Sequence, residues 1–499
     1  MNLDPSLDSG HAGKDPASFS KNKYVLLTGA TGFVGQYLLR DLIESGHSVA
    51  VIARASKQFS AAERVEQIMQ RWEAETGKHL PRPIVLQGNI TEKHLGLPEQ
   101  DVDWIKRQVD LVIHNAAILK FQGEPGNEPW NTNLGGTQNI VQLARDCQIK
   151  KFHYVSTAYT CGIRTTTVEE DLFDVGQQFR NDYERSKFAA EKYVREANFE
   201  SLTVYRPAVI VGDSENGFTS SYHGLYVYLR LMAMLIPQQQ RDANGIAQTP
   251  IRLPMNGDER RNLVPVNWVS QVITRIVNNP AAWGRTFHLT PTKLLTPREL
   301  IDHCYGYFNS SGVEYCGPTQ KLEQPSEFGS NFLQNIELYQ PYDSSDPIFD
   351  TTNLNQFVGD IPCPEIDQET VFKFIQFCEE DKWGKRRLDV PRCDFRIADQ
   401  LSVIQRKIES LVSLHRNNPD ALSISIRVVG PGGGDWTFIH QNGRTRVDRG
   451  TSLDSKIQIV ADIDEVQGLL QSELEPVQSA SRDGLSKSIA HLIAQAHLA

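Results

Sequence analysis

The sequence predicts an α/β protein with a doubly wound parallel Rossmann sheet and a smaller substrate lobe, followed by a separate α+β domain. Three observations predict this fold class. Apolar runs typical of buried strands alternate with helical patterns from Lys23 to about Leu300, which favours a parallel sheet with helices on both faces. A glycine-rich turn follows the first run. The pattern changes after Leu300 and again near Pro391, and 499 residues are too many for one ordinary core.

The first strand begins at Tyr24 and is followed by an amphipathic helix that stops at Gly46. Right-handed crossovers between successive strands then give the doubly wound arrangement. The further strands are expected at His47–Ala53, Ile84–Gly88, Asp110–Ala116, Lys151–Ser156 and Leu202–Val211, with helices that include Trp130–Cys147 and Asp182–Glu196.

The remaining chain is divided by composition. Residues 1–20 are polar and are expected to be a disordered lead-in, and 21–305 are expected to form the α/β domain with its smaller lobe. Residues 306–395 are predicted to be an irregular cap or connection, because 309–365 are rich in Ser, Pro, Asn, Gln and Gly with little periodicity.

The C-terminal part, 396–499, is predicted to be an α+β domain of ordinary size. It opens with a helical stripe and continues with alternating strands, and Asn442-Gly443 is typical of a hairpin turn because both residues tolerate positive φ. The stripe consists of Ile397, Leu401, Ile404, Ile408 and Leu411.

Composition excludes several classes of protein. The net charge is −10 and no basic stripe stands out, which argues against a nucleic-acid partner. The 7 cysteines are scattered, so a reduced, cytoplasmic chain is expected. The apolar run Leu225–Ile236 is shorter than the ~20 residues of a membrane span. It is either a core helix, the wall of an acyl-accepting pocket, or a membrane-surface helix.

The glycine turn predicts a dinucleotide site. Gly29 allows a tight bend, Gly32 lets the backbone approach a pyrophosphate, and Gly35 lets the helix pack against the sheet. The helix N-terminus then offers N–H groups to phosphate. A purely structural turn is the alternative.

The end of the second strand indicates which dinucleotide binds. An NAD site places a carboxylate about 20 residues beyond the glycine turn. Here the strand ends in Val51-Ile-Ala-Arg54 without a carboxylate, and Arg64 follows on the next helix. Because guanidinium groups bind phosphate, we expect NADP(H), whose 2′-phosphate Arg54 would meet. A solvated surface arginine is the alternative.

A tyrosine and a lysine four residues apart predict the catalytic centre. Tyr183 and Lys187 share one helix face, and the ammonium would lower the pKa of a phenol that is otherwise near 10. A Ser or Thr hydroxyl at the end of the neighbouring strand, in Val155-Ser-Thr-Ala-Tyr, could polarise a carbonyl. Together with a nicotinamide hydride they would reduce a carbonyl group. An exposed Tyr/Lys pair is the alternative.

These motifs occur in one order that resembles the extended short-chain dehydrogenase/reductase superfamily, over residues 23–300. The motifs are Thr28-Gly-Ala-Thr-Gly-Phe-Val-Gly35, His114-Asn-Ala-Ala117, Asn131-Thr-Asn-Leu-Gly-Gly-Thr137, Ser156-Thr157, Tyr183-x-x-x-Lys187 and Arg206-Pro-Ala208. Tyr205-Arg-Pro-Ala-Val-Ile-Val-Gly and Leu263-Val-Pro-Val-Asn-Trp-Val look most like the thioester reductase or male-sterility (fatty acyl reductase) branch.

The resemblance implies roles for individual residues. Thr157, rather than Ser156, would be the catalytic hydroxyl, Tyr183 the acid, and Lys187 the ribose-binding cation. Asn89 and Asn267 depart from the family, which has an acidic residue at these positions. The implied cofactor-binding residues are Gly29, Thr31, Gly32, Phe33, Val34, Gly35, Arg54, Arg64, Asn89, Ile90, Asn115, Ala116, Ala117, Asn133, Tyr183, Lys187, Pro207 and Ala208.

The C-terminal domain resembles a sterol-carrier-protein-2-like domain, a family with a twisted sheet and helices around an apolar lipid tunnel. The resemblance rests on Trp436-Thr-Phe-Ile, Asn442-Gly, Ile457-Gln-Ile-Val-Ala-Asp and Leu469-Leu-Gln-Ser-Glu-Leu-Glu-Pro476. Ser472 stands where that family has Gly. A structural or dimerising module is the alternative.

Taken with the resemblance, the sequence predicts an NADPH-dependent reductase of a fatty acyl thioester that releases an aldehyde or alcohol. The thiol would be coenzyme A or an acyl carrier protein acting in trans. The rival enzymes are a sterol or alcohol dehydrogenase and a nucleotide-sugar epimerase. The rival without turnover is a lipid-transfer or cofactor-sensing protein. No metal is expected.

Overall fold

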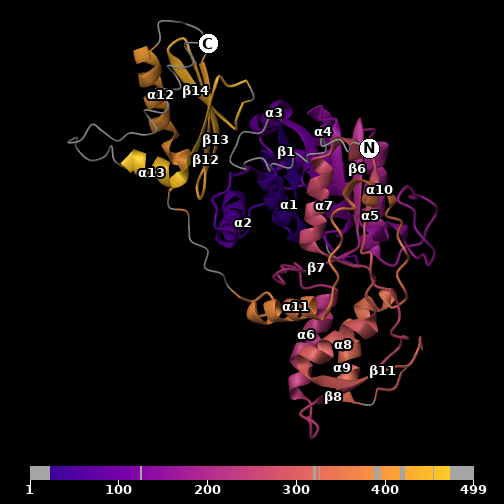
Figure 1. The fold of residues 1–499 in the computed structure, drawn as a ribbon. Coiled ribbons are helices and arrows are strands. Elements are labelled where there is room, and N and C mark those ends of the chain that lie inside the picture. Colours follow the sequence, from indigo (N-terminus) through magenta and orange to yellow (C-terminus); the bar gives the residue numbers. More distant parts are fainter. Residues whose placement is uncertain are drawn as a thin grey trace, which may run out of the picture.

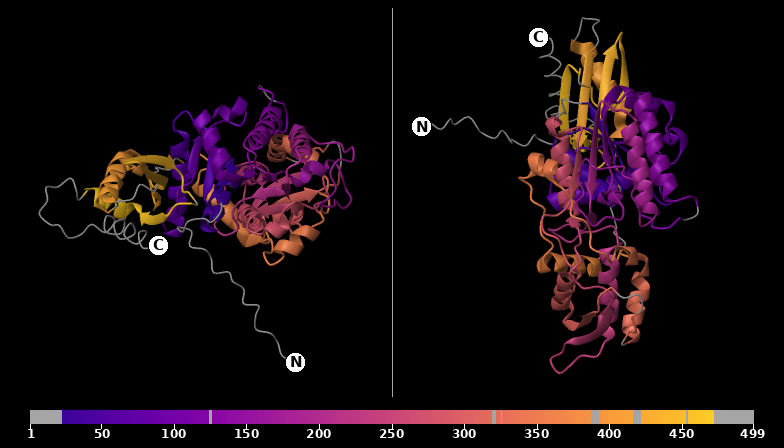
Figure 2. Two further views of the ribbon diagram at one scale, coloured as in Figure 1. Left: turned by 90° about the horizontal axis from the view of Figure 1, so that it is seen from above. Right: turned by 90° about the vertical axis from the view of Figure 1, so that its right-hand side faces the viewer.

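The computed structural model describes residues 23–123, 126–318, 322–324, 326–386, 393, 395–415, 422–452 and 454–471. The expected lead-in at 1–20, the boundary at Pro391 and the departure at Ser472 lie outside these residues. A central α/β body carries a lobe at one end and the C-terminal module at the other (Figures 1 and 2). Among the described helices, none combines the length and apolar character that crossing a membrane requires.

The central sheet confirms the predicted doubly wound fold. Its 7 strands lie in the order β10-β6-β5-β4-β1-β2-β3, and every neighbouring pair is parallel. The strand order reverses between β1 and β4, which is where such folds bind ligands. The strands are β1 (Tyr24–Thr28), β2 (Val49–Ala53), β3 (Ile84–Gln87), β4 (Val109–His114), β5 (Lys151–Val155), β6 (Ser201–Pro207) and β10 (Thr286–Leu289).

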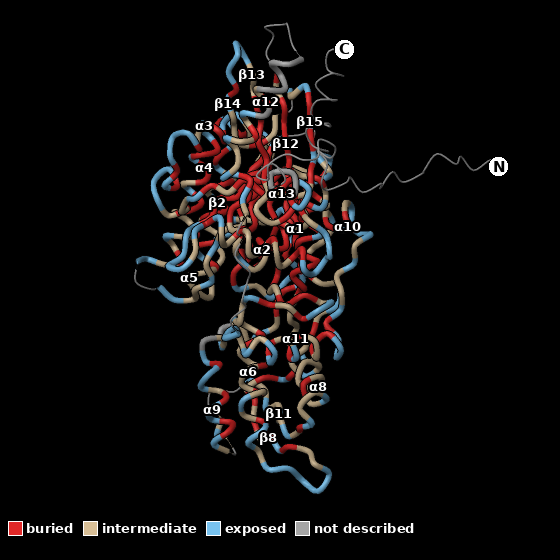
Figure 3. Tube along the Cα trace, turned by 90° about the vertical axis from the view of Figure 1, so that its left-hand side faces the viewer, coloured by how far each residue is buried: buried red, intermediate tan, exposed pale blue. Residues whose placement is uncertain are grey.

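Alternating side chains of β1 pack into two separate hydrophobic cores, one on each face of the sheet. Val25 and Leu27 pack with α1, α2 and α7 on one face, whereas Leu26 packs with α3, α4 and α5 on the other. Both faces of the sheet are therefore buried (Figure 3). These helices are α1 (Phe33–Glu44), α2 (Ala61–Thr76), α3 (Glu99–Gln108), α4 (Gly136–Asp146), α5 (Asp182–Glu196) and α7 (Val266–Val277), and the short turns are η1 (Lys93–Gly96), η2 (Asn131–Gly135), η3 (Ala158–Cys161) and η5 (Pro280–Ala282).

Two expected elements divide in the structure. The helix expected at Trp130–Cys147 begins as the π-helical turn η2 and continues as α4. The strand expected at Leu202–Val211 ends at Pro207: Ala208 N still donates to Leu289 O of β10, but Val209 N donates to Asn262 O instead. The following β7 (Val209–Val211) pairs with β9 (Leu263–Pro265) in a small separate sheet. The helix expected at Asp182–Glu196 has the predicted bounds.

The substrate lobe is built from segments that are distant in the sequence. Strands β8 and β11 pair in parallel, and the helices around them share one hydrophobic cluster that includes Leu229, Phe332 and Phe374. The elements of this part of the chain are α6 (Leu225–Leu235), η4 (Ile236–Gln238), β8 (Ala247–Leu253), α8 (Pro297–Phe308), β11 (Ser310–Tyr315), α9 (Glu327–Ile336), η6 (Glu337–Tyr342), α10 (Thr352–Val358) and α11 (Gln368–Glu380).

The expectation of an irregular segment at 309–365 is wrong in its local structure. This segment contains β11, α9 and α10, and β11 bonds to β8 across the expected boundary at residue 305. Helix α10 packs on α7 and β10 of the central body through Leu354 and Val358. These elements are short and polar on their outer faces. Each therefore contains too few apolar residues for the sequence to show a clear helix or strand periodicity.

The C-terminal module is an α+β unit with a sheet in the order β14-β13-β12-β15. Strand β15 is parallel to β12, and the other pairs are antiparallel. Asn442 and Gly443 form the predicted turn with φ of 51° and 74°. The elements are η7 (Ile397–Gln400), α12 (Leu401–His415), β12 (Leu422–Val429), β13 (Gly434–Gln441), β14 (Arg444–Arg449), β15 (Ile457–Asp462) and α13 (Ile463–Gln471).

The polar face of this module docks on the edge of the central sheet where the strands begin. Tyr24, at the start of β1, donates from its hydroxyl to Asp435 at 2.9 Å, and Arg427 donates to Ser48, just before β2, at 2.8 Å. Trp104 of α3 donates from its indole nitrogen to the Arg449 carbonyl at 2.7 Å. The module is thus held by hydrogen bonds to residues that precede three different strands.

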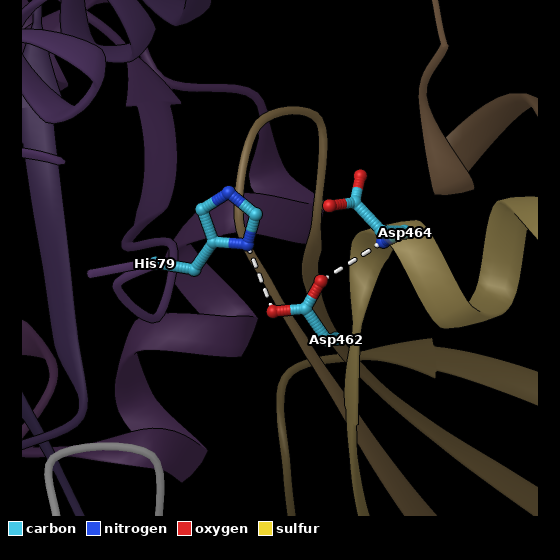
Figure 4. Close-up of side chains that lie close together, drawn as sticks. All are labelled: His79, Asp462 and Asp464. Carbon is cyan, nitrogen blue, oxygen red and sulfur yellow. Dashed lines mark hydrogen bonds and ion pairs between the residues drawn. The ribbon is translucent and has the colours of Figure 1, made fainter. Parts of the chain in front are cut away.

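A histidine extends the same junction. His79, which precedes β3, lies 2.8 Å from the Asp462 carboxylate, and Asp462 also accepts from the Asp464 N–H (Figure 4). Among the described residues, His79, Asp462 and Asp464 are a group that could hold a metal ion, with ligand atoms within 4.8 Å of one another.

We predict that Asp435→Asn destabilises the full chain strongly. Asp435 and Arg427 form an ion pair of 2.7 Å with side chains only 1% and 2% exposed. The substitution removes the negative charge beside a buried guanidinium, at a cost of about 3–5 kcal/mol. Chemical denaturation measures this loss.

The matched control is Asp448→Asn in the same module, whose partner Arg446 is 70% exposed. That substitution should change the free energy of unfolding by less than ~1 kcal/mol. Equal losses of unfolding free energy in Asp435→Asn and Asp448→Asn would contradict the prediction that the buried ion pair matters more for stability than the exposed one.

Candidate active site

One cavity of about 700 Å³ runs along the edge where the strands of the central sheet end, and it continues into the substrate lobe. The glycine turn after β1, the ends of β2 and β4, and the first residues after β5 all line it. It therefore lies at the opposite edge of the sheet from the C-terminal module. This is the edge where parallel α/β sheets bind their ligands.

The glycine turn is folded as a dinucleotide cradle. Gly29 has a φ of 74°, and a Cβ there would lie 2.8 Å from Ala116 Cα. A Cβ on Gly35 would lie 1.9 Å from the Gly29 carbonyl oxygen. Helix α1 can therefore pack against the turn only if residue 35 has no side chain. Helix α1 has no side-chain N-cap and no acidic residue in its first turn, which leaves its N–H groups available to an anion.

Two arginines stand at one end of the cavity. Arg64 donates to the Arg54 carbonyl at 2.6 Å and to the Thr31 hydroxyl at 3.1 Å. Burial and the neighbouring Arg54 charge lower the pKa of Arg64. Arg54 and Arg64 both line the cavity. Two like charges held together beside the glycine turn are chemically suited to a phosphate group.

The loop after β4 is fixed by buried hydroxyl and imidazole groups. The Thr28 hydroxyl accepts from the N–H groups of Asn115 and Ala116, each at 3.2 Å, and it lies 2.7 Å from His114 Nδ1. Burial lowers the pKa of His114 to about 3, so this imidazole is neutral. Sequence reasoning assigned no role to Thr28 or to the His114 ring, because their contacts join separate strands.

The three predicted catalytic residues meet at this cavity. Thr157 follows β5, whereas Tyr183 and Lys187 lie one turn apart on α5, and all three line the cavity. The Thr157 hydroxyl donates to the Pro207 carbonyl at 3.5 Å, and it lies near enough to the Tyr183 phenol to lower the pKa of that group. Lys187 is only 2% exposed, and its Nζ donates to the Val155 carbonyl at 2.7 Å. The alternative of a solvated Tyr/Lys pair does not fit this burial.

The pKa of Tyr183 differs from the expectation. Burial and the Glu184 charge together raise it to about 12, and only the nearby Thr157 hydroxyl opposes them. Burial also lowers the pKa of Lys187 to about 7. The expected depression of the phenol pKa by Lys187 is therefore not present. A phenol that stays protonated at neutral pH can act as a proton donor.

Three of the predicted cofactor-binding residues do not line the cavity. Gly35 acts through its packing on Gly29. Asn89 folds into its own turn, where it accepts from Thr91 and donates to Glu92, and the neighbouring Gly88 lines the cavity instead. Asn133 accepts from the Ile118 N–H at 2.9 Å and donates to the Ser186 hydroxyl at 2.9 Å. It thus ties the β4 loop to α5.

The other predicted cofactor-binding residues do line the cavity. They are Gly29, Thr31, Gly32, Phe33, Val34, Arg54, Arg64, Ile90, Asn115, Ala116, Ala117, Tyr183, Lys187, Pro207 and Ala208. Asn267, the second departure from the family pattern, instead binds the Ser214 backbone and hydroxyl.

The far part of the cavity has many apolar side chains, with Arg261, Asp343 and Asp346 also on the cavity wall, and it was only partly anticipated. Helix α6, whose role was left open, supplies Leu225, Leu229 and Met232 both to the lobe core and to the cavity wall. Sequence reasoning missed the opposite wall, which comes from β8, α8, β11 and α9. Its residues include Ile251, Leu253, Leu300, Ile301, Cys304, Val313, Phe332 and Ile336.

Comparison with known proteins shows what the chain is similar to. Residues 27–273 match the model of the family described as Male sterility protein. The aldehyde reductase lnaA of Aspergillus flavus is 25% identical over 390 residues, covering 71% of this chain and 36% of the relative. A linear gramicidin synthase of Brevibacillus parabrevis is 29% identical over 394 residues, covering 75% of this chain and 7% of the relative. The chain thus spans about a third or less of these relatives.

Solved structures share the fold. The terminal R domain of the myxalamid PKS-NRPS pathway superposes with a TM-score of 0.58 at 21% identity, covering 75% of this chain and 94% of that one. A thiolation-reductase di-domain from an archaeal non-ribosomal peptide synthetase gives 0.54 at 19% identity, covering 73% and 76%.

Fold, site and relatives together define an NAD(P)-dependent oxidoreductase. More particularly, residues 27–273 are similar to the Male sterility protein family of NAD-binding domains.

We predict that Tyr183→Phe lowers turnover by about 10²–10⁴-fold, the usual contribution of a positioned acid. The phenol is one of many groups along the cavity, so NADPH affinity should change little. Stopped-flow turnover and cofactor titration separate the two quantities. Tyr193→Phe on the outer part of the same helix is the control, and wild-type turnover in Tyr183→Phe would remove the phenol from the chemistry.

Proposed function

We propose that this protein is an NADPH-dependent reductase of acyl thioesters with an apolar acyl chain. The observation that carries the proposal is the continuity of one cavity, which joins the glycine turn, Thr157, Tyr183 and Lys187 to the apolar chamber of the substrate lobe. Such a chamber can bury an acyl chain at about 0.8 kcal/mol per methylene.

The residues of the cavity fit the cofactor and the reaction. Bound NADPH would supply the hydride that attacks the thioester carbonyl carbon. Tyr183 would donate a proton to the carbonyl oxygen, with Thr157 orienting that oxygen. The C–S bond of the resulting hemithioacetal would then break, releasing an aldehyde and a thiol. A second reduction of the aldehyde would give the alcohol.

The thiol carrier is proposed by similarity. One structural neighbour joins a thiolation domain to its reductase domain, and one relative is a linear gramicidin synthase. A carrier-protein thioester is therefore the proposed substrate class, with a coenzyme A thioester as the alternative. A sterol or alcohol dehydrogenase and a nucleotide-sugar epimerase would use the same catalytic residues, and the choice of substrate distinguishes them.

Consumption of NADPH with a panel of acyl thioesters tests the proposal. The panel pairs coenzyme A and carrier-protein thioesters of several chain lengths with free alcohols, sterols and nucleotide sugars. Thioester-dependent NADPH oxidation with aldehyde or alcohol formation supports the proposal. Activity confined to sterols or nucleotide sugars would replace it with a rival, and NADPH binding without turnover would favour a sensor.

We predict that NADPH binds more tightly than NADH and that Arg54→Ala narrows the difference. One charge-assisted contact contributes about 1.5–3 kcal/mol, or roughly tenfold to a hundredfold in affinity. Titration of both cofactors against both proteins measures the change. Tighter binding of NADH by the wild type would contradict the role of the arginine pair.

We predict that Cys304→Phe shortens the longest acyl chain that is accepted. Cys304 is fully buried and lines the far part of the cavity, so a larger side chain should fill the space of the last methylenes. Each methylene excluded should cost about fourfold in kcat/KM. Cys316→Phe, at an exposed position in the same lobe, is the control and should leave the chain-length profile unchanged.

We propose a structural role for the C-terminal module, whose sequence resembles sterol-carrier-protein-2-like domains. The module lies at the edge of the sheet remote from the cavity. Its apolar face is filled by Ile404 and Ile408 of α12 and by Ile463 and Val466 of α13. We infer that it braces the central body rather than delivering a lipid to the site.

Deleting the chain from Cys393 onward tests this role. The truncated protein should lose stability while keeping the chain-length preference of the full chain. A weaker preference for long chains after truncation, with saturable binding of a fluorescent fatty acid to the full chain but not to the truncated one, would instead support lipid delivery.

A further inference from the structure

We propose that Glu191 is a positioning residue of the active site, which locks α5 against β5 and β6 and supplies a negative charge beside Lys187. The inference rests on the proposed roles of Tyr183 and Lys187. Glu191 and its partner Arg206 do not line the cavity, so neither is assigned to substrate or cofactor.

Two bonds fix the register of α5 along the end of β5. Lys187 donates to the Val155 carbonyl at 2.7 Å, and the Ser156 hydroxyl donates to the Glu191 carboxylate at 2.6 Å. Lys187 and Glu191 are four residues apart and lie on one helix face, while Val155 and Ser156 are adjacent. Thr157 directly follows Ser156. Any shift of α5 that broke these two bonds would therefore also move Tyr183 relative to the Thr157 hydroxyl.

Glu191 is itself held from the neighbouring strand. Arg206 of β6 donates to its carboxylate at 2.7 Å, and Arg195 of α5 donates at 2.8 Å. Glu191 is fully buried and Arg206 is 2% exposed. Burial alone would raise the pKa of Glu191, but the two guanidinium groups outweigh it and hold the pKa at about 2. The carboxylate is therefore charged at every working pH.

This charge acts on Lys187. Burial lowers the pKa of Lys187, and among the described residues the Glu191 carboxylate is the charge that opposes this effect. Without it, the lysine would share a buried region with two arginines. The other titratable groups packed around Lys187 are neutral near pH 7: His114 on β4, Tyr154 on β5, whose ring lies 4.5 Å from the ammonium, and Tyr183 on α5.

The substitution Lys187→Met cannot test this inference, because it removes the lysine whose charge Glu191 is proposed to influence. A turnover assay alone cannot test it either, because loss of Lys187 function lowers turnover whatever its cause. The decisive variants change the charge beside it in opposite directions. Glu191→Gln removes the anion and leaves two cations. Arg195→Gln removes one cation, from a side chain that is 30% exposed, and leaves the carboxylate in place. A loss of packing would affect both variants in the same direction, whereas an electrostatic role would not.

The experiment measures NADPH affinity against pH for the full chain by intrinsic fluorescence, with no substrate present. In the wild type, affinity should fall as the pH rises through about 7, where Lys187 loses its proton. In Glu191→Gln this midpoint should move down by about one pH unit, the usual effect of losing a neighbouring opposite charge. In Arg195→Gln it should move up. The control is Glu196→Gln, an exposed carboxylate at the end of the same helix, with an unchanged midpoint.

The inference would be overturned if the pH midpoints of NADPH affinity in Glu191→Gln and Arg195→Gln both equalled that of the wild type. It would also be overturned if both midpoints moved in the same direction. If Glu191→Gln does not fold, Arg195→Gln and Ser156→Ala carry the test. Ser156→Ala removes the 2.6 Å bond without changing a charge, so it should lower kcat several-fold with the NADPH midpoint unchanged, and an unaltered kcat would exclude the positioning role. The binding midpoints need no thioester, so a failure of the proposed reaction would leave them unaffected.

Discussion

All seven strands of the central sheet run in one direction, and the positions of the site and of the C-terminal module follow from this constraint. Parallel strands place every strand end at one edge and every strand start at the other. The glycine turn, the arginine pair and Thr157 therefore gather at one edge. Tyr24, Ser48 and the residues before β3 gather at the other, where the module binds.

The active-site edge concentrates buried charge. Lys187, Glu191 and Arg206 are all nearly inaccessible to solvent, and a buried ion is tolerated only where partners replace its water. Here the partners are a backbone carbonyl, a hydroxyl and two guanidinium groups, which also join α5 to β5 and β6. The same contacts thus satisfy the charges and fix the geometry in which Tyr183 meets Thr157.

The substrate lobe supplies the apolar part of the site by combining distant segments. Strand β8 pairs with β11 across more than fifty residues of chain, and α6, α8 and α9 close the chamber around them. None of the described residues of the C-terminal module lines this chamber. Its polar sheet face covers strand starts, with the Arg427–Asp435 pair buried between the two parts, which is the contact expected of a brace.

The sequence by itself determined the doubly wound sheet, the cofactor turn and the Tyr183/Lys187 pair, because each depends on residues close together in the chain: apolar runs, glycine spacing and a single helix turn. It did not reveal the fold of 309–365 or the groups around Lys187. Those depend on contacts between distant segments, such as β11 with β8 and Arg206 with Glu191. The tertiary structure also decided the pKa of Tyr183, since burial by surrounding segments is the largest cause of its rise.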